Sequence, residues 1–219
     1  MAEPARRSRQ EIAARVATDI ADGSYVNLGI GIPTLVADYL PSGQSPADRE
    51  VIFHSENGLL GIGPSPRPGM EDPEVINAGK QLVTIVDGSC YMSHSDSFAL
   101  IRGGHLDLAV LGAFQVSSRG DLANWATLGE RAPAVGGAMD LAAGARAVWV
   151  TMSHTTSAGE PKLVEACTYP LTAAGVVSRV YTDLATLRVD RDRGCFVAEE
   201  LVDGVSLDQL KELTAATVV

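Results

Sequence analysis

The chain has 219 residues, of which 46% are hydrophobic and 20% are charged, a composition that excludes wholesale disorder. A formal net charge of −10 at pH 7 argues against nucleic acid as a partner, because phosphate binding needs a cationic face. No apolar run approaches the roughly 20 residues of a membrane-spanning helix. The basic N-terminus leads into no hydrophobic signal region, so we expect a cytoplasmic protein with one domain over residues 1–219.

The cysteines and histidines form no recognisable metal or disulfide pattern. The three cysteines (90, 167 and 195) are odd in number and lack a CxxC spacing. The four histidines (54, 94, 105 and 154) include no HxH or HxxxH pair. We therefore expect a reducing compartment, no disulfide framework and no metal site.

The first third of the chain predicts a helix, a strand and a second helix. Ser8-Arg-Gln-Glu11 reads as a capping box, and the helix that it opens ends at Asp22-Gly23. Residues 25–30 predict a short strand that turns through a glycine-rich segment into a helix over 34–40. Pro33 suits the first helical position, because its missing N–H would be unpaired there.

The rest of the chain alternates apolar runs with helical patterns. Residues 41–50 are polar and predict an exposed loop. Helices are expected near 95–102, closed by Gly103-Gly104, and from the capping box at Ser206. Apolar runs that predict strands lie at 51–53, 82–86, 106–116, 146–152, 176–182 and 195–202. This alternation predicts an α/β fold with an open, mainly parallel and partly mixed sheet, covered by helices on both faces.

The segment His54–Pro64 places one carboxylate, Glu56, where an apolar strand runs out into a glycine-rich loop. Catalytic side chains in α/β proteins are commonly held at strand ends. Glycines 58, 61 and 63 allow unusual backbone angles and would let a ligand approach the main chain. Glu56 is therefore a catalytic candidate, and a surface-loop carboxylate is the alternative.

Three other segments offer polar groups to a ligand. Gly29–Pro33 lacks the third glycine of a dinucleotide fingerprint, but its N–H groups could face an anion or a carbonyl. Asn27 could place its amide in the same cleft, or be a satisfied buried asparagine. Lys80, beside a glycine, suits a phosphate contact, or is a solvated loop lysine. The turn at 134–140 could present backbone N–H groups to an oxyanion, or simply start a helix.

Two further polar clusters have less specific interpretations. The serines at 93, 95 and 97 accompany His94 and Asp96, but no GxSxG elbow exists, so we interpret the cluster as the cap of the following helix. Gly120–Trp125 combines polar and aromatic residues and could line a pocket or anchor a loop.

Several short sequence blocks, which follow one another in the same order as in a known family, carry a family resemblance. Ser-Glu-Asn-Gly at 55–58, within His54–Pro64, resembles the signature of the class I coenzyme A transferases, in their B subunit. Further matching blocks lie at 27–33, 76–80, 97–105, 120–125, 136–141 and 167–172. The stretches 167–172 and 181–185 look most like the 3-oxoadipate transferases of aromatic catabolism, with succinyl-CoA:3-oxoacid transferases as near relatives. The fold implied is that shared by coenzyme A transferases and sugar-phosphate isomerases.

The resemblance implies a covalent mechanism and a role for individual residues. Glu56 would attack the acyl-CoA thioester, and the resulting anhydride would become a glutamyl-CoA thioester. Gly137 would supply an oxyanion N–H, and Asn27 would be the polar group of the pocket. Lys80 and Gly136 would contact coenzyme A. No permanently bound cofactor is implied, since the coenzyme A thioester is itself the substrate.

The resemblance also implies an A subunit, absent from this chain, in an A2B2 heterotetramer. The expected donor is succinyl-CoA, and the expected acceptor is 3-oxoadipate, with acetoacetate or acetate as alternatives. Arg102 and Arg119 are candidates for the distal end of the acceptor. A hydrolase or lyase acting on acyl-CoA, and a non-enzymatic ligand-binding module of similar fold, remain as alternatives.

Overall fold

A computed structural model of the chain describes residues 5–40, 50–127, 129 and 134–219. The loop expected at 41–50 therefore lies, apart from Glu50, outside the described residues. Within these ranges, no helix is long and apolar enough to cross a bilayer. The same residues contain no group of three or more His, Cys, Asp or Glu side chains able to hold a metal ion.

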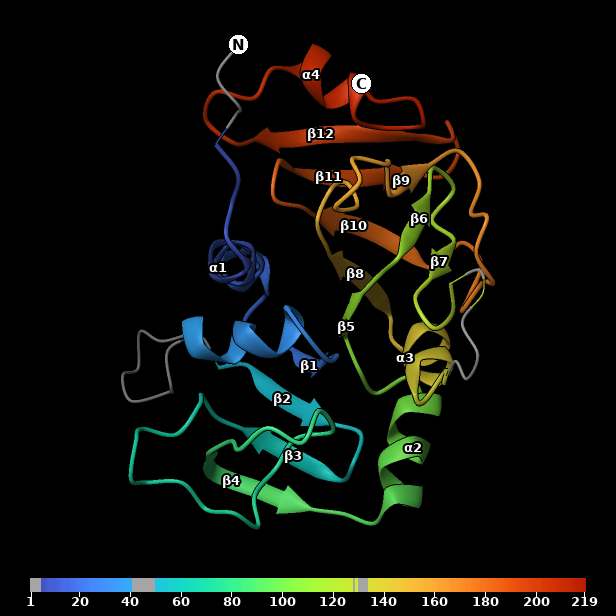
Figure 1. The fold of residues 1–219 in the computed structure, drawn as a ribbon. Coiled ribbons are helices and arrows are strands. Elements are labelled where there is room, and N and C mark those ends of the chain that lie inside the picture. The colour runs from blue at the N-terminus through green and yellow to red at the C-terminus, as the bar shows by residue number, and fades with distance from the viewer. Residues whose placement is uncertain (1–4, 41–49, 128, 130–133) are drawn as a thin grey trace.

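A nine-stranded sheet runs through the molecule in the order β12-β11-β10-β8-β5-β1-β2-β3-β4 (Figure 1). Its five central strands are mutually parallel: β10 (Val177–Tyr181), β8 (Ala147–Thr151), β5 (Leu108–Gly112), β1 (Tyr25–Leu28) and β2 (Ile52–Ser55). Two antiparallel strands extend each side: β11 (Ala185–Asp190) with β12 (Cys195–Leu201), and β3 (Leu59–Ile62) with β4 (Ile85–Tyr91). The predicted mixed, mainly parallel sheet is confirmed.

Helices cover both faces of the sheet. The helical elements are α1 (Arg9–Asp19), η1 (Pro33–Tyr39), α2 (His94–Arg102), α3 (Ala138–Gly144) and α4 (Leu207–Glu212). Strand β5 shows the two-sided burial, because Leu108 and Val110 pack with α1 and η1 whereas Ala109 and Leu111 pack with α2 and α3. Figure 1 shows these two helix pairs on opposite sides of the central strands. The predicted capping boxes at Ser8 and Ser206 are both formed.

The local structure differs from the sequence prediction in two elements. The helix after Pro33 is a 3₁₀ helix, whose N-cap Ile32 has no side chain able to cap it. The strand expected at 82–86 begins at Ile85 and runs to Tyr91. Its second half, Asp87-Gly-Ser-Cys90, is polar because this edge strand is largely exposed, so hydrophobicity could not reveal it.

The second half of the chain contains strands that the hydrophobic pattern of the sequence did not predict as separate elements. β6 (Gln115–Ser117), β7 (Leu122–Ala123) and β9 (Leu163–Val164) form a small second sheet in the order β7-β6-β9. Two of these strands have only two residues each, which is too short for a period-2 pattern. β11 was also missed, although its hairpin with β12 completes one side of the main sheet.

The glycine-rich segment 58–63 is mostly a strand, not a loop, and its glycines face protein. A Cβ on Gly58 (φ 111°) would lie 2.3 Å from the Met92 carbonyl oxygen. A Cβ on Gly61 (φ 90°) would lie 2.8 Å from Ser89 Cβ, on the neighbouring strand β4. The expectation that these glycines admit a ligand is therefore wrong, since they admit the backbone and side chains of the adjoining β4 segment.

Candidate active site

Glu56 lies at the carboxyl end of β2, in the turn that leads into β3. The turn is closed by the Gly58 N–H, which donates to the Ser55 carbonyl oxygen at 3.0 Å. The Glu56 residue is half-buried. Because β2 is parallel to β1 and β5, their carboxyl ends meet at one edge of the sheet, where ligands of open α/β folds bind.

Asn27 holds the carboxylate from the neighbouring strand. It is fully buried on β1, paired in register with His54 of β2. Its Nδ2 donates to Glu56 Oε2 at 3.2 Å, and the His54 carbonyl oxygen and Nδ1 lie at the same distance. Asn27 Oδ1 has no hydrogen-bond partner although it is buried. Asn27 is thus a neighbour of Glu56, as predicted.

The backbone of Glu56 is held by α2. Ser97 Oγ donates to the Glu56 carbonyl oxygen at 3.0 Å and lies 2.9 Å from His54 Nε2. His54 and Ser97 are both fully buried, and burial lowers the pKa of His54 to about 4. His54 is therefore neutral at pH 7, and one polar cluster joins β1, β2 and α2 around the carboxylate.

Gly137 approaches the carboxylate from the third side. It is the N-cap residue of α3, and a Cβ placed on it would lie 3.6 Å from Glu56 Cγ and 3.1 Å from Phe98 Cζ. Its φ of −82° is accessible to any residue, so glycine is not needed here for backbone conformation. Its lack of a side chain instead leaves room beside Glu56 and Phe98. The structure thus brings Gly137 beside Glu56, as predicted.

The residues that flank Glu56 bind the turn that carries Lys80. Ser55 Oγ accepts from the Ala78 N–H at 2.8 Å, and Asn57 Nδ2 donates to the Ile76 carbonyl oxygen at 2.8 Å. Lys80 is exposed and has a φ of 62°, which is uncommon for a residue with a side chain. The signature segment therefore fixes the position of Lys80 next to the site, at some cost in backbone strain.

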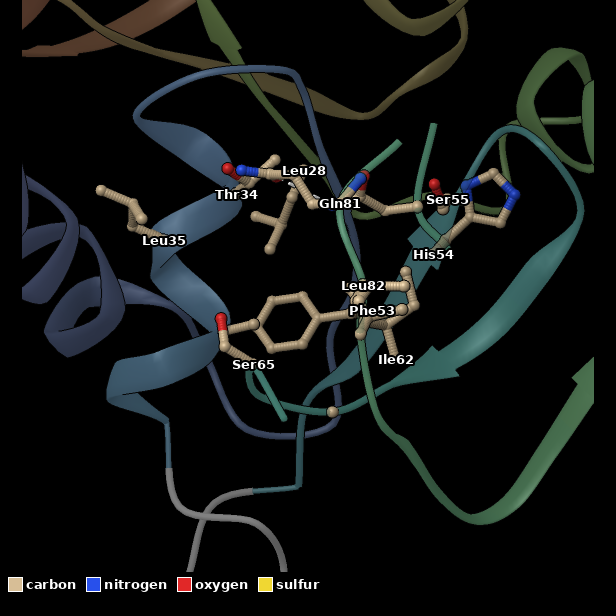
Figure 2. A pocket seen from close by; sticks show the side chains of 14 residues that line it. Leu28, Thr34, Leu35, Phe53, His54, Ser55, Ile62, Ser65, Gln81 and Leu82 are labelled. Carbon is tan, nitrogen blue, oxygen red and sulfur yellow. Dashed lines mark hydrogen bonds between the residues drawn. The ribbon is translucent and has the colours of Figure 1, made fainter. Parts of the chain in front are cut away.

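A small cavity of about 60 Å³ lies behind the site, on the opposite face of β2 (Figure 2). Phe53 points into it towards η1, whereas His54 points away from it. Leu28, Ser55 and Leu82 contribute to its wall, but Glu56 does not. The cavity therefore adjoins the strand that carries the carboxylate without containing the reactive group.

Other residues that were predicted as site candidates make contacts within the protein away from Glu56. Gly29 donates its N–H to the Val110 carbonyl oxygen at 2.9 Å, so this donor of the 29–33 turn is not free for a ligand. The 120–125 segment is an anchor, with Trp125 Nε1 donating to the Leu171 carbonyl oxygen at 3.2 Å. The Arg119 guanidinium lies near Gly194 in the β11–β12 turn, at the end of the main sheet away from β2. The structure therefore does not place Arg119 beside Glu56.

Arg102 stays close to the site but does not reach Glu56. Its guanidinium is paired with Asp140 at 2.7 Å and lies over the Phe98 ring, 5.5 Å from the centroid. Phe98 in turn lies against Gly137, so Phe98 separates Arg102 from the residues around Glu56. His54, Ser97 and Phe98 were not predicted as site residues. For Ser97 the available signal was its place in the serine-rich cluster at 93–97, which was interpreted as a helix cap.

Comparisons with known proteins identify the family of this chain. A family model described as coenzyme A transferase matches residues 9–213. The chain is 59% identical over 213 residues to the B subunit of the 3-oxoadipate CoA-transferase of Pseudomonas putida, covering 97% of this chain and 96% of that protein. It is 49% identical over 208 residues to the B subunit of the succinyl-CoA:3-ketoacid coenzyme A transferase of Helicobacter pylori, covering 95% and 97%.

Among solved structures, the acyl-CoA transferase apoenzyme of Escherichia coli O157:H7 superimposes with a TM-score of 0.72 at 20% sequence identity. The superposition covers 97% of this chain and 42% of that longer chain, so it supports the fold alone. The match to the family model and the high identity to the Pseudomonas putida subunit both extend over nearly the whole sequence. The chain therefore belongs to the coenzyme A transferase family, in agreement with its resemblance to the class I B subunits.

Proposed function

We propose that this chain is the B subunit of an enzyme that transfers coenzyme A from succinyl-CoA to a 3-oxoacid, with 3-oxoadipate as the acceptor. One observation carries the proposal. The carboxylate of Glu56 is hydrogen-bonded by Asn27 beside Gly137, in a chain 59% identical to the B subunit of a 3-oxoadipate CoA-transferase. Acetoacetate is the second candidate acceptor, because a relative named for 3-ketoacids is 49% identical.

In the proposed reaction, an oxygen of Glu56 attacks the thioester carbonyl of succinyl-CoA and expels the coenzyme A thiolate. The product is a mixed anhydride between succinate and Glu56. The thiolate then attacks the Glu56 carbonyl of this anhydride, releasing succinate and leaving a glutamyl-CoA thioester. The acceptor carboxylate reverses both steps, so one thioester is exchanged for another and Glu56 is regenerated.

The neighbours of Glu56 suit this sequence of steps. The Asn27 amide donates to a carboxylate oxygen and so orients it before attack. The N–H of Gly137, at the N-terminus of α3, is our candidate donor to the oxyanion that forms at each carbonyl. Lys80 and Gly136, which are both on loops next to the site, are our candidates for the contacts to coenzyme A. An anhydride hydrolyses readily, so the assembled site must exclude water.

The proposal includes a partner. The relatives named above are B subunits, which implies an A subunit for this chain, and we propose an A2B2 assembly. The exposed apolar side chains of Ile30, Ile76 and Leu82, which lie on segments near the site, are consistent with a protein partner there.

The test is acceptor-dependent turnover of the chain co-purified with its A subunit. Without an acceptor, we expect at most one equivalent of succinate per active site, from formation of the glutamyl-CoA thioester. Continued release of succinate should require an acceptor, with the highest kcat/KM for 3-oxoadipate, then acetoacetate, then acetate. The chain without the A subunit should be inactive. Equal turnover with and without acceptor would indicate a hydrolase, and full activity of the isolated chain would refute the need for a partner.

A further inference from the structure

His54 is buried between the two groups that hold Glu56. Its Nδ1 lies 3.2 Å from Asn27 Nδ2, and its Nε2 lies 2.9 Å from Ser97 Oγ. The residue is 0% exposed, so a ligand cannot reach its side chain. What it can affect is the geometry of its neighbours.

The donor and the acceptor can be assigned in each hydrogen bond that links Glu56, Ser97, His54 and Asn27. The single hydroxyl hydrogen of Ser97 is donated to the Glu56 carbonyl oxygen, which can only accept. Ser97 Oγ must therefore accept from His54, which places the imidazole proton on Nε2. Nδ1 is then unprotonated and accepts from the Asn27 amide.

This arrangement also determines which way the Asn27 amide points. Its NH₂ faces three acceptors, namely His54 Nδ1, the His54 carbonyl oxygen and Glu56 Oε2. In the flipped orientation, Oδ1 would face the carboxylate and be repelled by it. Because Oδ1 has no partner of its own, the amide is oriented by the acceptors around Nδ2 alone.

We propose that His54 and Ser97 are positioning residues for Glu56, with Ser97 fixing its backbone carbonyl and His54 fixing the Asn27 amide that orients its carboxylate. This inference depends on the proposed role of Glu56 as the nucleophile. The structure contains all four residues in one continuous set of hydrogen bonds across β1, β2 and α2. Such supporting contacts hold a reactive group in its productive geometry.

The competing explanation is that His54 is only a satisfied core histidine, and the chain offers a matched control for it. His154 is also 0% exposed, and burial also lowers its pKa to about 4. It lies between the hydroxyls of Thr182 and Thr214, at 3.1 and 2.9 Å. It follows β8, which is three strands from β2 in the sheet, and it shares no hydrogen bond with Glu56 or Asn27 among the described residues.

The experiment compares His54→Leu, His54→Gln and Ser97→Ala with His154→Leu, all in complex with the A subunit. We expect His54→Leu and Ser97→Ala to lower kcat about 10- to 100-fold, the effect of a misplaced reactive group, with KM for succinyl-CoA within about threefold of wild type. His54→Gln should recover most of the lost kcat, because a carboxamide also offers a donor and an acceptor. His154→Leu should lower the unfolding midpoint to a similar extent as His54→Leu while leaving kcat unchanged.

Ser97→Ala removes one oxygen atom and carries the test if His54→Leu does not fold. Wild-type kcat in folded Ser97→Ala and His54→Leu would overturn the inference, as would an equal loss of kcat in His154→Leu. The role of Glu56 is checked separately, by borohydride trapping of the wild-type complex with succinyl-CoA. Trapped Glu56 together with unchanged kcat in the variants refutes the positioning role alone, whereas an unmodified Glu56 refutes the nucleophile and the inference with it.

Discussion

Replacing Glu56 with glutamine is expected to lower turnover by about 10⁵- to 10⁶-fold, the usual effect of removing a covalent nucleophile. An amide oxygen cannot form the anhydride and then be regenerated as a carboxylate. The fold should be preserved, because Glu56 is half-buried and glutamine Oε1 can still accept from Asn27 Nδ2. The measurement is kcat of the complex with the A subunit, together with the unfolding midpoint of the variant.

Two further variants make this result specific. Glu56→Asp keeps the carboxylate but withdraws it by one methylene group, so we expect a loss of at least about 100-fold with trapping still detectable. Glu160→Gln removes an exposed carboxylate elsewhere in the chain and should leave kcat unchanged. Near-normal turnover of Glu56→Gln would contradict the mechanism, once mass spectrometry has excluded deamidation back to glutamate.

Replacing Gly58 with alanine is expected to prevent folding, or to destabilise the chain by more than about 4 kcal/mol. The added Cβ would lie 2.3 Å from the carbonyl oxygen of Met92, a backbone atom that cannot rotate away. The φ of 111° adds strain for any L-residue with a side chain. The measurement is the yield of folded protein and, where it can be purified, its unfolding midpoint.

Gly88→Ala is the matched control for this prediction. Gly88 also has a positive φ, of 84°, but no atom lies within 4 Å of the position of its Cβ. It should therefore show the conformational cost alone, about 1 to 3 kcal/mol. Equal stability of the two variants would show that the close approach of the Met92 carbonyl oxygen is not the reason why position 58 requires glycine.

The parallel centre of the sheet was predictable because each of its strands overlaps a mainly apolar segment of the sequence. Helices α1, α2 and α4 were also predictable, because their serine caps are explicit in the sequence. Strand β3 was not, since a strand that contains Gly61 and begins beside Gly58 reads locally as a loop. Neither were the exposed half of β4 and the two-residue strands β7 and β9, which carry no hydrophobic periodicity.

For the site, the resemblance predicted that Glu56, Asn27 and Gly137 belong together, and the structure places all three in contact or close approach. The residues that support them were not predictable in the same way. Ser97 is separated from Glu56 by 41 residues, and its bond to the Glu56 carbonyl arises only when α2 packs behind β2. The serine-rich cluster was interpreted as a helix cap, but Ser93 alone is the cap, whereas Ser97 lies inside the helix.

Trapping the covalent intermediate tests the proposed role of Glu56 most directly. The complex of this chain with its A subunit is incubated with succinyl-CoA and no acceptor, reduced with borohydride, digested and analysed by mass spectrometry. We expect the peptide containing Glu56 to carry a primary alcohol in place of that carboxyl group, and the same treatment without succinyl-CoA to leave it unchanged. An unmodified Glu56 in a complex that still turns over succinyl-CoA with an acceptor would contradict the mechanism.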